Sequence, residues 1–560
     1  MKDLHKKNTA ADVTLMYSTP ALREETAGKF MSEAIRAKRP VEDYWRRMKA
    51  YYDGRHDTAR QTGDFLSSLD LPWTPATVPD AYLHVESQID PKIPDFEFAG
   101  REENDAKNAS NRERVVRYIC DISDMERKNS INERRLNLFG SAVWKLAVCA
   151  GDHGDAEVMI DNPSPECIYT DPCASSVDEC EYIACSYKMS KLRAERVFAA
   201  DLYREGTSVQ QILLCAEKNG NALSADTDLS SGEELVTVTE WWFRQPTDGV
   251  YEVTSGDGHT YVCPYSAGDI ALSIFLCGRE IRYIPKFWEN TGCDKYPIVI
   301  YGKIASDGSV WGKSEIEPLI PLIDAADRQL AFAQLNTAFS ANDILLCEEN
   351  AFAPDSYPDN RPGAVWKLRP GMIDRVSRLG GLSGDSAGHY EIVDRYRALM
   401  KETIGNYDFM QGDSSTQVTT ATGLALLSDF ASKRVSAKSA SKKAGFARLY
   451  MLADYLALEV YGREKLRAIG IGGDDVSDGI DYISSCGYVP KLDVRVFVGD
   501  GVEFSRSYAI SALKSIMETS VTKDNYPIVK EYIRAMKLPD GNSLIAALSE
   551  LFEKETENEE

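Results

Sequence analysis

Histidines and paired cysteines are scarce in this sequence, and long apolar runs are absent from it. Its 560 residues include six histidines, none at the local spacing of metal ligands, and twelve cysteines without a Cys-x-x-Cys pair. We therefore expect free thiols in a reducing compartment, no metal and no cofactor. No window approaches the roughly 18 consecutive apolar residues of a membrane span. The Lys-rich start at Met1–Thr9 lacks the apolar core of a signal peptide, so we expect a soluble intracellular product with no membrane partner.

Basic residues are also in deficit. The 64 lysines and arginines face 87 acidic residues, which gives a net charge of −23. Proteins that read a DNA sequence carry a basic surface, so this acidity argues against a sequence-specific DNA-binding protein. It also permits DNA to pass without sticking, because phosphate contacts supply most non-specific affinity. The length suits several packed modules rather than one core.

Motifs for enzymatic chemistry are incomplete. Gly308–Ser314 resembles a phosphate-binding loop but has three residues between its glycines instead of four, so it predicts a turn followed by a helix cap. Gly384–Gly388 matches a serine nucleophile elbow, but no apolar strand precedes it and the only later histidine is His389, which favours a connector. Asp474–Gly479 lacks calcium ligands and predicts an acidic turn. We expect no enzyme.

The first half of the chain changes from helical to strand patterning. Residues 1–20 suit a flexible arm, and Val41–Tyr52 predicts a helix that stops at Gly54. Charged residues at helical spacing continue from Asn104 to Ala142. Strands are then expected at Val143–Cys149, Ala156–Ile160, Glu181–Tyr187, Thr237–Phe243 and Pro297–Tyr301, with a short helix at Lys191–Ala200.

A long helix is expected from residue 313 to 342. Ser314–Glu317 has the spacing of a capping box, and Pro321 should kink or delay the helix. There is no charge between Arg328 and Asp343. A helix that is uncharged over about four turns is expected to pack on more than one side, against its own chain or against copies of itself.

An insert rich in proline follows, and a second helix is expected at Tyr390–Ile404. Short strands are expected at Ile344–Cys347 and Ala364–Leu368. Five basic residues make the insert a local reversal of the global charge: Arg361, Lys367, Arg369, Arg375 and Arg378. A clustered patch on a compact module is the expected footprint for phosphate, and a solvated surface is the alternative.

A polar loop and a very long helix come next. The helix should run for roughly 40 residues to about Tyr461, and its middle is crowded with Ala, Ser and Gly. Arg434, Lys438 and Lys442 are four residues apart and form one stripe, with no acid between Asp429 and Asp454. The stripe suits a solvated helix face, or a face toward DNA or an acidic neighbouring subunit. A strand at Leu492–Val498 and about three amphipathic helices follow.

Taken in order, these elements resemble bacteriophage portal proteins, the rings at the unique capsid vertex through which DNA enters and leaves. The order of two helices around an insert, then a loop and a long helix, carries most of the resemblance. Local motifs support it at Tyr44-Trp45, Tyr51–His56, Phe139–Lys145, Pro163, Pro165, Ile168, Asp171-Pro172 and Gly312–Asp324.

The resemblance implies an α+β portal-type fold. Its parts would be an arm (1–20), a mixed α/β wing (21–312), a stem helix (313–342), a small α/β clip (343–388), a second stem helix (389–405), a tunnel loop (406–420), a long wing helix with a following strand (421–500), and a helical crown with an acidic tail (501–560). The tunnel loop would contact the duplex through Gln411, Gly412, Asp413, Ser414, Ser415, Thr416 and Gln417.

The resemblance also implies an assembly and partners. We expect a homo-oligomeric ring, usually of twelve subunits, in the virion at the capsid vertex, assembled in the host cytoplasm and without catalysis of its own. Expected partners are the terminase large subunit, a head-completion adaptor protein, major capsid and scaffold proteins, and double-stranded DNA held transiently. Two alternatives remain open: a structural or scaffold protein of a virion that is not the portal, and a nucleotide-dependent enzyme built on Gly308–Ser314.

Overall fold

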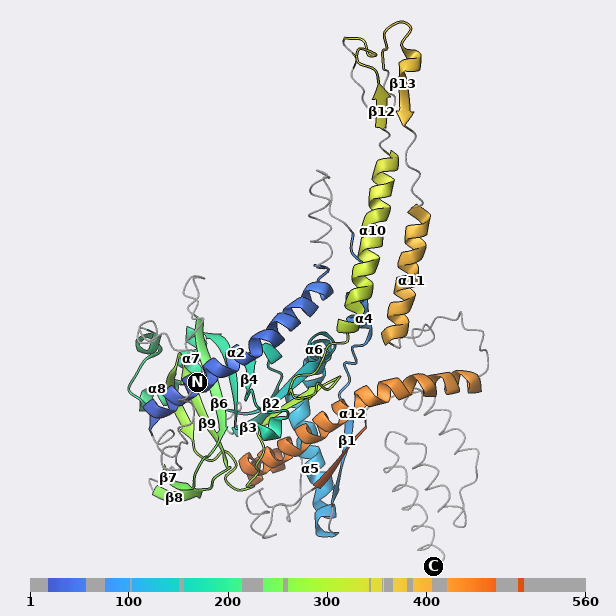
Figure 1. The fold of residues 1–560 in the computed structure, drawn as a ribbon. Helices are drawn as coiled ribbons and strands as arrows, with labels where there is room; N and C mark the ends of the chain where they lie inside the picture. The colour runs from blue at the N-terminus through green and yellow to red at the C-terminus, as the bar shows by residue number, and fades with distance from the viewer. Residues whose placement is uncertain are drawn as a thin grey trace, which may run out of the picture. The chain divides into compact units, whose positions relative to one another are not determined.

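The computed structural model divides the chain into two compact units (Figure 1). The first comprises residues 1–44, 90–314 and 416–560, and the second residues 45–89 and 315–415. The structure describes residues 19–56, 76–100, 103–150, 156–213, 235–254, 260–341, 344–354, 356, 366–379, 386–404, 421–469 and 492–497. Helices combine with antiparallel sheets in these residues, which confirms the α+β class.

The largest sheet of the described residues lies in the first unit and has five strands in the order β10-β9-β6-β5-β4. Its strands are β4 (Ile168–Thr170), β5 (Tyr182–Ser190), β6 (Leu235–Arg244), β9 (Ile270–Leu276) and β10 (Arg279–Ile284). Helix α2 (Pro20–Tyr52) begins in this unit and lies across the sheet (Figure 1). Its residues Ala27 and Met31 belong to one buried cluster with Trp241 and Phe243. The helical spacing of these small and apolar residues therefore docks α2 on the sheet.

Buried polar residues fix the docking of α2. Nζ of Lys38 donates to the carbonyl oxygens of Pro165, Glu166 and Ile168 at 2.7–2.8 Å. Burial lowers the pKa of Lys38 to about 8. The turn that carries the proline and isoleucine motif thus presents three carbonyls to one side chain of α2. Arg23, near the start of α2, makes a buried two-point contact with Glu280 of β10.

A three-stranded sheet, β11 (Ile298–Gly302), β2 (Ser141–Ala150) and β3 (Ala156–Asp161), is the second layer. Helix α6 (Met125–Phe139) enters β2 through Gly140, which has a φ of +80°. A Cβ at Gly140 would lie 2.3 Å from the carbonyl carbon of Lys313, so only glycine fits. Lys145 of β2 forms a buried ion pair with Glu240 of β6 at 2.6 Å, which joins the two sheets. The predicted glycine-then-Trp-Lys motif therefore makes a close turn followed by an inter-sheet ion pair.

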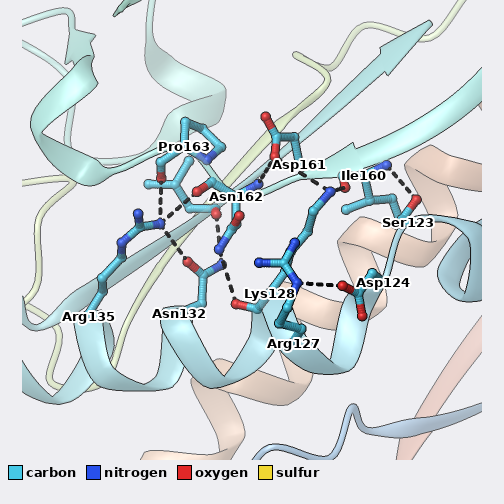
Figure 2. A network of polar contacts seen from close by, with 11 residues as sticks. Ser123, Asp124, Arg127, Lys128, Asn132, Arg135, Ile160, Asp161, Asn162 and Pro163 are labelled. Atoms are coloured by element: carbon cyan, nitrogen blue, oxygen red, sulfur yellow. Dashed lines mark hydrogen bonds and ion pairs between the residues drawn. The ribbon is translucent and has the colours of Figure 1, made fainter. Parts of the chain in front are cut away.

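Figure 2 shows how the turn after β3 is held against α6. Arg135 donates to the carbonyl oxygens of Asn162 and Pro163 at 2.6 and 3.2 Å. The Asn162 side chain donates back to the carbonyl oxygen of Lys128, and the hydroxyl of Ser123 accepts the main-chain N–H of Ile160. These contacts satisfy main-chain groups that the turn would otherwise leave unpaired.

Helix α12 (Ala421–Val460) has 40 residues, as the sequence predicted, and its last turns lie inside the first unit. Phe446, Leu449 and Tyr450 are fully buried there. A Cβ added to Gly445 would meet the ring of Tyr301 at 2.7 Å, so the glycine lets α12 approach β11 closely. At Gly445, the small residues predicted in the middle of this helix therefore allow close packing within the chain.

Other elements complete the first unit. A two-stranded sheet pairs β1 (Asp95–Gly100) with β14 (Leu492–Phe497), and a hairpin pairs β7 (Gly249–Thr254) with β8 (Thr260–Tyr265). The remaining helices described in it are α5 (Glu103–Ile122), α7 (Lys191–Val197), α8 (Ala199–Arg204), α13 (Arg463–Ala468), η1 (Pro165–Cys167) and η2 (Val177–Glu179). Among the helices of the described residues, none combines the length and apolar character needed to cross a membrane.

The second unit is built around a helical hairpin. Helix α10 (Ile320–Ala341) leads to β12 (Ile344–Cys347), β13 (Val376–Leu379) pairs with β12, and α11 (Ser386–Ile404) returns beside α10 (Figure 1). The unit also contains α4 (Asp80–Ser87), η3 (Glu317–Leu319) and η4 (Ile373–Arg375).

Several sequence predictions are wrong in detail. The first hairpin helix does not begin directly after Ser314, because α10 begins only at Ile320, after η3; the Ser314 hydroxyl donates to the carbonyl oxygen of Asn137. Pro321, in the first turn, is consistent with this delayed start. The strand expected at Ala364–Leu368 lies partly outside the described residues, and Leu368 makes only an isolated bridge to Phe352, whereas β12 pairs with β13.

Two helix boundaries also differ from the predictions. The second hairpin helix starts at Ser386 rather than Tyr390, so Ser386–Gly388 are helical and not part of a connector. The helical stretch expected from Asn104 to Ala142 is two helices, which Ser123 and Asp124 separate; Asp124 has a φ of +51°. The arm, the crown helices and the acidic turn at Asp474–Gly479 lie outside the described residues, apart from Thr19 and Pro20.

Breaking one buried ion pair should destabilise the first unit strongly. Arg112 of α5 makes a two-point contact with Asp454 of α12, and both side chains are buried. Arg112→Met leaves a buried carboxylate unpaired and should cost about 3–5 kcal/mol, whereas Arg112→Met combined with Asp454→Leu should recover most of that loss. Urea unfolding followed by tryptophan fluorescence measures both. A double variant as unstable as the single one contradicts this account.

Candidate channel and docking elements

The base of the hairpin is tied by a buried histidine–aspartate pair. Nδ1 of His56 lies 2.5 Å from Oδ2 of Asp327, and its Nε2 lies 3.1 Å from the carbonyl oxygen of Tyr51. The His56 side chain is completely buried. The other oxygen of Asp327 accepts the main-chain N–H of Val78. Both ring nitrogens of His56 thus face acceptors, an arrangement that only the protonated imidazole satisfies fully.

Charge and burial compete at His56. Burial lowers its pKa, but the Asp327 carboxylate and the Tyr51 carbonyl outweigh burial, and the pKa is raised above its ordinary value of 6.5. The Tyr51 ring stacks on the imidazole, and the Tyr51 hydroxyl donates to Asp324 at 2.8 Å. The predicted Tyr51–His56 motif is therefore a connection to the first turns of α10.

Two more contacts hold α4, one to the segment that precedes α10 and one to α11. Nε2 of His84 lies 3.2 Å from Oε2 of Glu315, and both side chains are buried. Nε of Arg397 on α11 donates to both carboxylate oxygens of Asp80 at 3.1 Å. Residues far away in sequence thus anchor the hairpin. The spacing of residues along the chain gives no signal for such contacts.

The seam of the hairpin is polar but uncharged. His389 of α11 lies between Gln329 and Asn336 of α10, with Nδ1 2.7 Å from Oε1 of Gln329 and Nε2 3.1 Å from Nδ2 of Asn336. The amide N–H of Asn336 must donate to Nε2, so Nδ1–H donates to Gln329. Gln329 and Asn336 are two turns apart on one side of α10.

The uncharged stretch of α10 combines buried and exposed apolar residues. Ala331, Ala333 and Leu335 are buried, whereas Phe332 is 44% exposed. On α11, three large apolar side chains are similarly exposed: Tyr390, Ile392 and Leu399. The hairpin therefore presents apolar surface along both helices, which is the pattern of a contact surface rather than of a solvated helix pair.

The predicted basic patch of the insert is placed in part. Lys367, Arg369 and Arg375 are exposed, and Arg375 pairs with Glu348 at 2.6 Å. Arg361 lies outside the described residues; Arg378 is in β13, but its side chain is not described. Ile373 is 75% exposed beside these cations. The insert therefore offers an apolar side chain next to positive charge.

The predicted stripe on the long helix needs a correction. Lys442 is buried, and its Nζ lies 2.7 Å from Glu133 of α6, so it faces neither solvent nor DNA. Gly445, three residues on, allows the close approach that buries it. Arg434 and Lys438 lie in α12, but their side chains are not described. All seven residues of the predicted tunnel loop, Gln411 to Gln417, lie outside the described residues.

The loop that resembles a phosphate-binding motif is a turn. Gly308 has a φ of +68°, and the main-chain N–H of Lys313 donates to the carbonyl oxygen of Ile304.

A model of the phage P22-like portal protein family matches residues 84–422, which is more than half of the chain. No curated protein matches the chain.

The match defines a structural protein of the phage head–tail connector. The chain belongs to the P22-like portal protein family. Its function is that of a phage portal, and the alternative of a virion protein that is not the portal is not favoured. The family is structural rather than enzymatic, and it places the chain in a homo-oligomeric ring at the capsid vertex of the virion.

The His56–Asp327 pair should make the stability of the hairpin base depend on pH. Because the pKa of His56 is raised by folding, its contribution is complete below pH 6.5 and is lost as the pH rises through the folded-state value. The thermal midpoint should fall as the pH rises above 6.5. His56→Gln should flatten this part of the profile, which differential scanning calorimetry measures. His389→Gln is the matched control and should keep the slope. An unchanged slope in His56→Gln rules out His56 as its source.

Proposed function

We propose that this chain forms a ring of twelve subunits whose axial channel conducts the phage genome during packaging and ejection. The observation that carries the proposal is the family match over residues 84–422. The part of α10 after Arg328 supports it, because it carries no charge and exposes the apolar Phe332, which gains from burial against a further copy. We further propose that assembly takes place in the host cytoplasm, with major capsid and scaffold proteins as partners.

The insert between α10 and α11 serves, in this proposal, as the clip that docks other proteins. Its exposed Ile373, Lys367 and Arg369 offer an apolar anchor with a positive rim, a combination typical of protein interfaces. The terminase large subunit would bind there during packaging, and the head-completion adaptor afterwards. The chain itself supplies no catalysis and uses no cofactor.

The tunnel loop is proposed to touch the duplex without holding it. Residues Gln411–Gln417 contain no lysine or arginine and a single acid, Asp413. Because affinity for DNA rises with each neutralised phosphate, a lining without cations lets the duplex slide. Arg434 and Lys438 remain candidates for contacts with DNA or with a neighbouring subunit.

Purified protein should form closed rings with an axial hole, visible by negative-stain electron microscopy. Phe332→Asp places a charge on the apolar side of α10 and should shift the particles to monomers and small oligomers, because an unpaired charge would be buried between copies. Circular dichroism checks that the variant is folded. Globular particles without a hole from the unmodified protein would refute the ring.

Replacing Gly412–Thr416 with a Lys-rich segment should leave the rings intact but stall DNA, because each added cation anchors a phosphate. Packaged DNA protected from nuclease should fall about tenfold or more in a packaging assay. A Ser- and Thr-rich replacement of the same length is the control. Normal yields from the Lys-rich variant mean that the segment does not face the duplex.

A further inference from the structure

Helices α7 and α8 carry an outward surface that is both apolar and basic. Leu192 and Tyr203 are 79% and 90% exposed, and Val197 is more than half exposed. Arg193, Arg196 and Arg204 are exposed among them. Asp201 of α8 is buried and paired with Arg282, and Glu195 and Glu205 offset only part of this positive charge. We name Leu192, Arg193, Arg196, Val197, Tyr203 and Arg204 the α7–α8 face.

The hairpin β7–β8 carries a surface of the opposite sign. Val250 and Val262 are 67% and 62% exposed, and Tyr261 is similarly exposed. Asp248 and Glu252 are exposed beside them, and the described residues of the two strands contain no lysine or arginine. We name Asp248, Val250, Glu252, Tyr261 and Val262 the β7–β8 face.

The two faces lie at opposite ends of the five-stranded sheet. Ser190, the last residue of β5, pairs with Leu235 at the first end of β6, and α7 follows directly. The other end of β6 is Arg244, which pairs with Ile270, and β7 begins five residues after it. Figure 1 shows α7 and the β7–β8 hairpin at these two ends. Both belong to the first unit, so their separation is a property of that unit alone.

We propose that the α7–α8 face of one copy docks on the β7–β8 face of the next copy around the ring. This inference rests on the proposed ring. A contact between two different faces of one chain is heterologous, and such contacts form a ring when the rotation from copy to copy closes after a whole number of copies. Exposed apolar side chains at the centre of each face would provide the burial, and the arginines would meet the two carboxylates at the rim.

The net charge of the chain gives a physical reason for this arrangement. Each copy carries −23, so copies that come together repel one another. A basic face on an acidic protein offsets that repulsion where it meets an acidic neighbour, and it selects one orientation because the reverse pairing brings like charges together. The α7–α8 face is thus complementary in charge to the β7–β8 face, and neither face is complementary to a second copy of itself.

Charge exchange between the two faces tests the proposal on the full-length protein. Arg196→Glu alone and Glu252→Arg alone should each raise the protein concentration at which half of the chains are in rings, by about five- to tenfold, because like charges then oppose one another. The double variant should return to within about twofold of the unmodified protein. Sedimentation velocity measures the ring fraction. Arg127→Glu, an equal charge change at an exposed residue of α6, is the matched control and should leave it unchanged.

A photo-crosslinking residue at position 203 locates the contact directly. With equal amounts of isotope-labelled and unlabelled chains in one ring, the cross-link should join labelled to unlabelled chains and map within residues 248–265. Cross-links to residues 214–234 of the same chain, or to another part of the neighbour, overturn the proposal. So do single charge variants that assemble normally, or a double variant no better than the worse single one. If the unmodified protein forms no ring, the proposed function fails as well, and ring formation without the exchange effect removes this contact alone.

Discussion

Buried ion pairs between segments far apart in sequence hold the first unit together. Arg23–Glu280, Arg112–Asp454, Lys145–Glu240 and Lys442–Glu133 each join a different pair of elements, and all eight side chains are largely buried. Removing one member leaves a desolvated charge, so the cost of a mismatch is high even where the net gain of a pair is small. Such pairs therefore select one arrangement of α2, α12 and the sheets over other arrangements with equally good apolar packing.

The second unit uses the same device with histidine in place of lysine or arginine. The His56–Asp327 pair connects the segment before α4 to α10, and the His84–Glu315 pair connects α4 to the segment just before α10. The Tyr51 hydroxyl adds a hydrogen bond to Asp324 of α10. Histidine changes charge near neutral pH, so the His56–Asp327 anchor responds to the pH of the solution in a way that the arginine pairs do not. The hairpin is thus firmly placed at its base, while its apolar sides are open to further contacts.

Periodicity and turn chemistry predicted most of the elements but not their partners. The 40-residue helix, the five strands predicted between Val143 and Tyr301 and the hairpin with its insert follow from local patterns, which is why they were predictable. The start of the first hairpin helix was predicted too early because the capping spacing is local, whereas the Ser314 hydroxyl donates to the carbonyl oxygen of Asn137, 177 residues away. Lys442 was assigned to an exposed stripe for the same reason, since Glu133 lies on another helix. The His56–Asp327 and His84–Glu315 pairs, 271 and 231 residues apart, leave no local pattern at all.

The pairing of β1 with β14 has a consequence for synthesis on the ribosome. Asp95–Gly100 is made early, and its partner Leu492–Phe497 follows about 400 residues later. At ordinary translation speeds the wait is on the order of 20–80 seconds, during which Phe96 and Phe98 are without the strand that covers them. An unpaired strand edge with aromatic residues invites association between nascent chains on one polysome. Copies of a ring protein are made close together on one polysome. The delay before β14 pairs with β1 therefore affects whether neighbouring chains assemble correctly or aggregate.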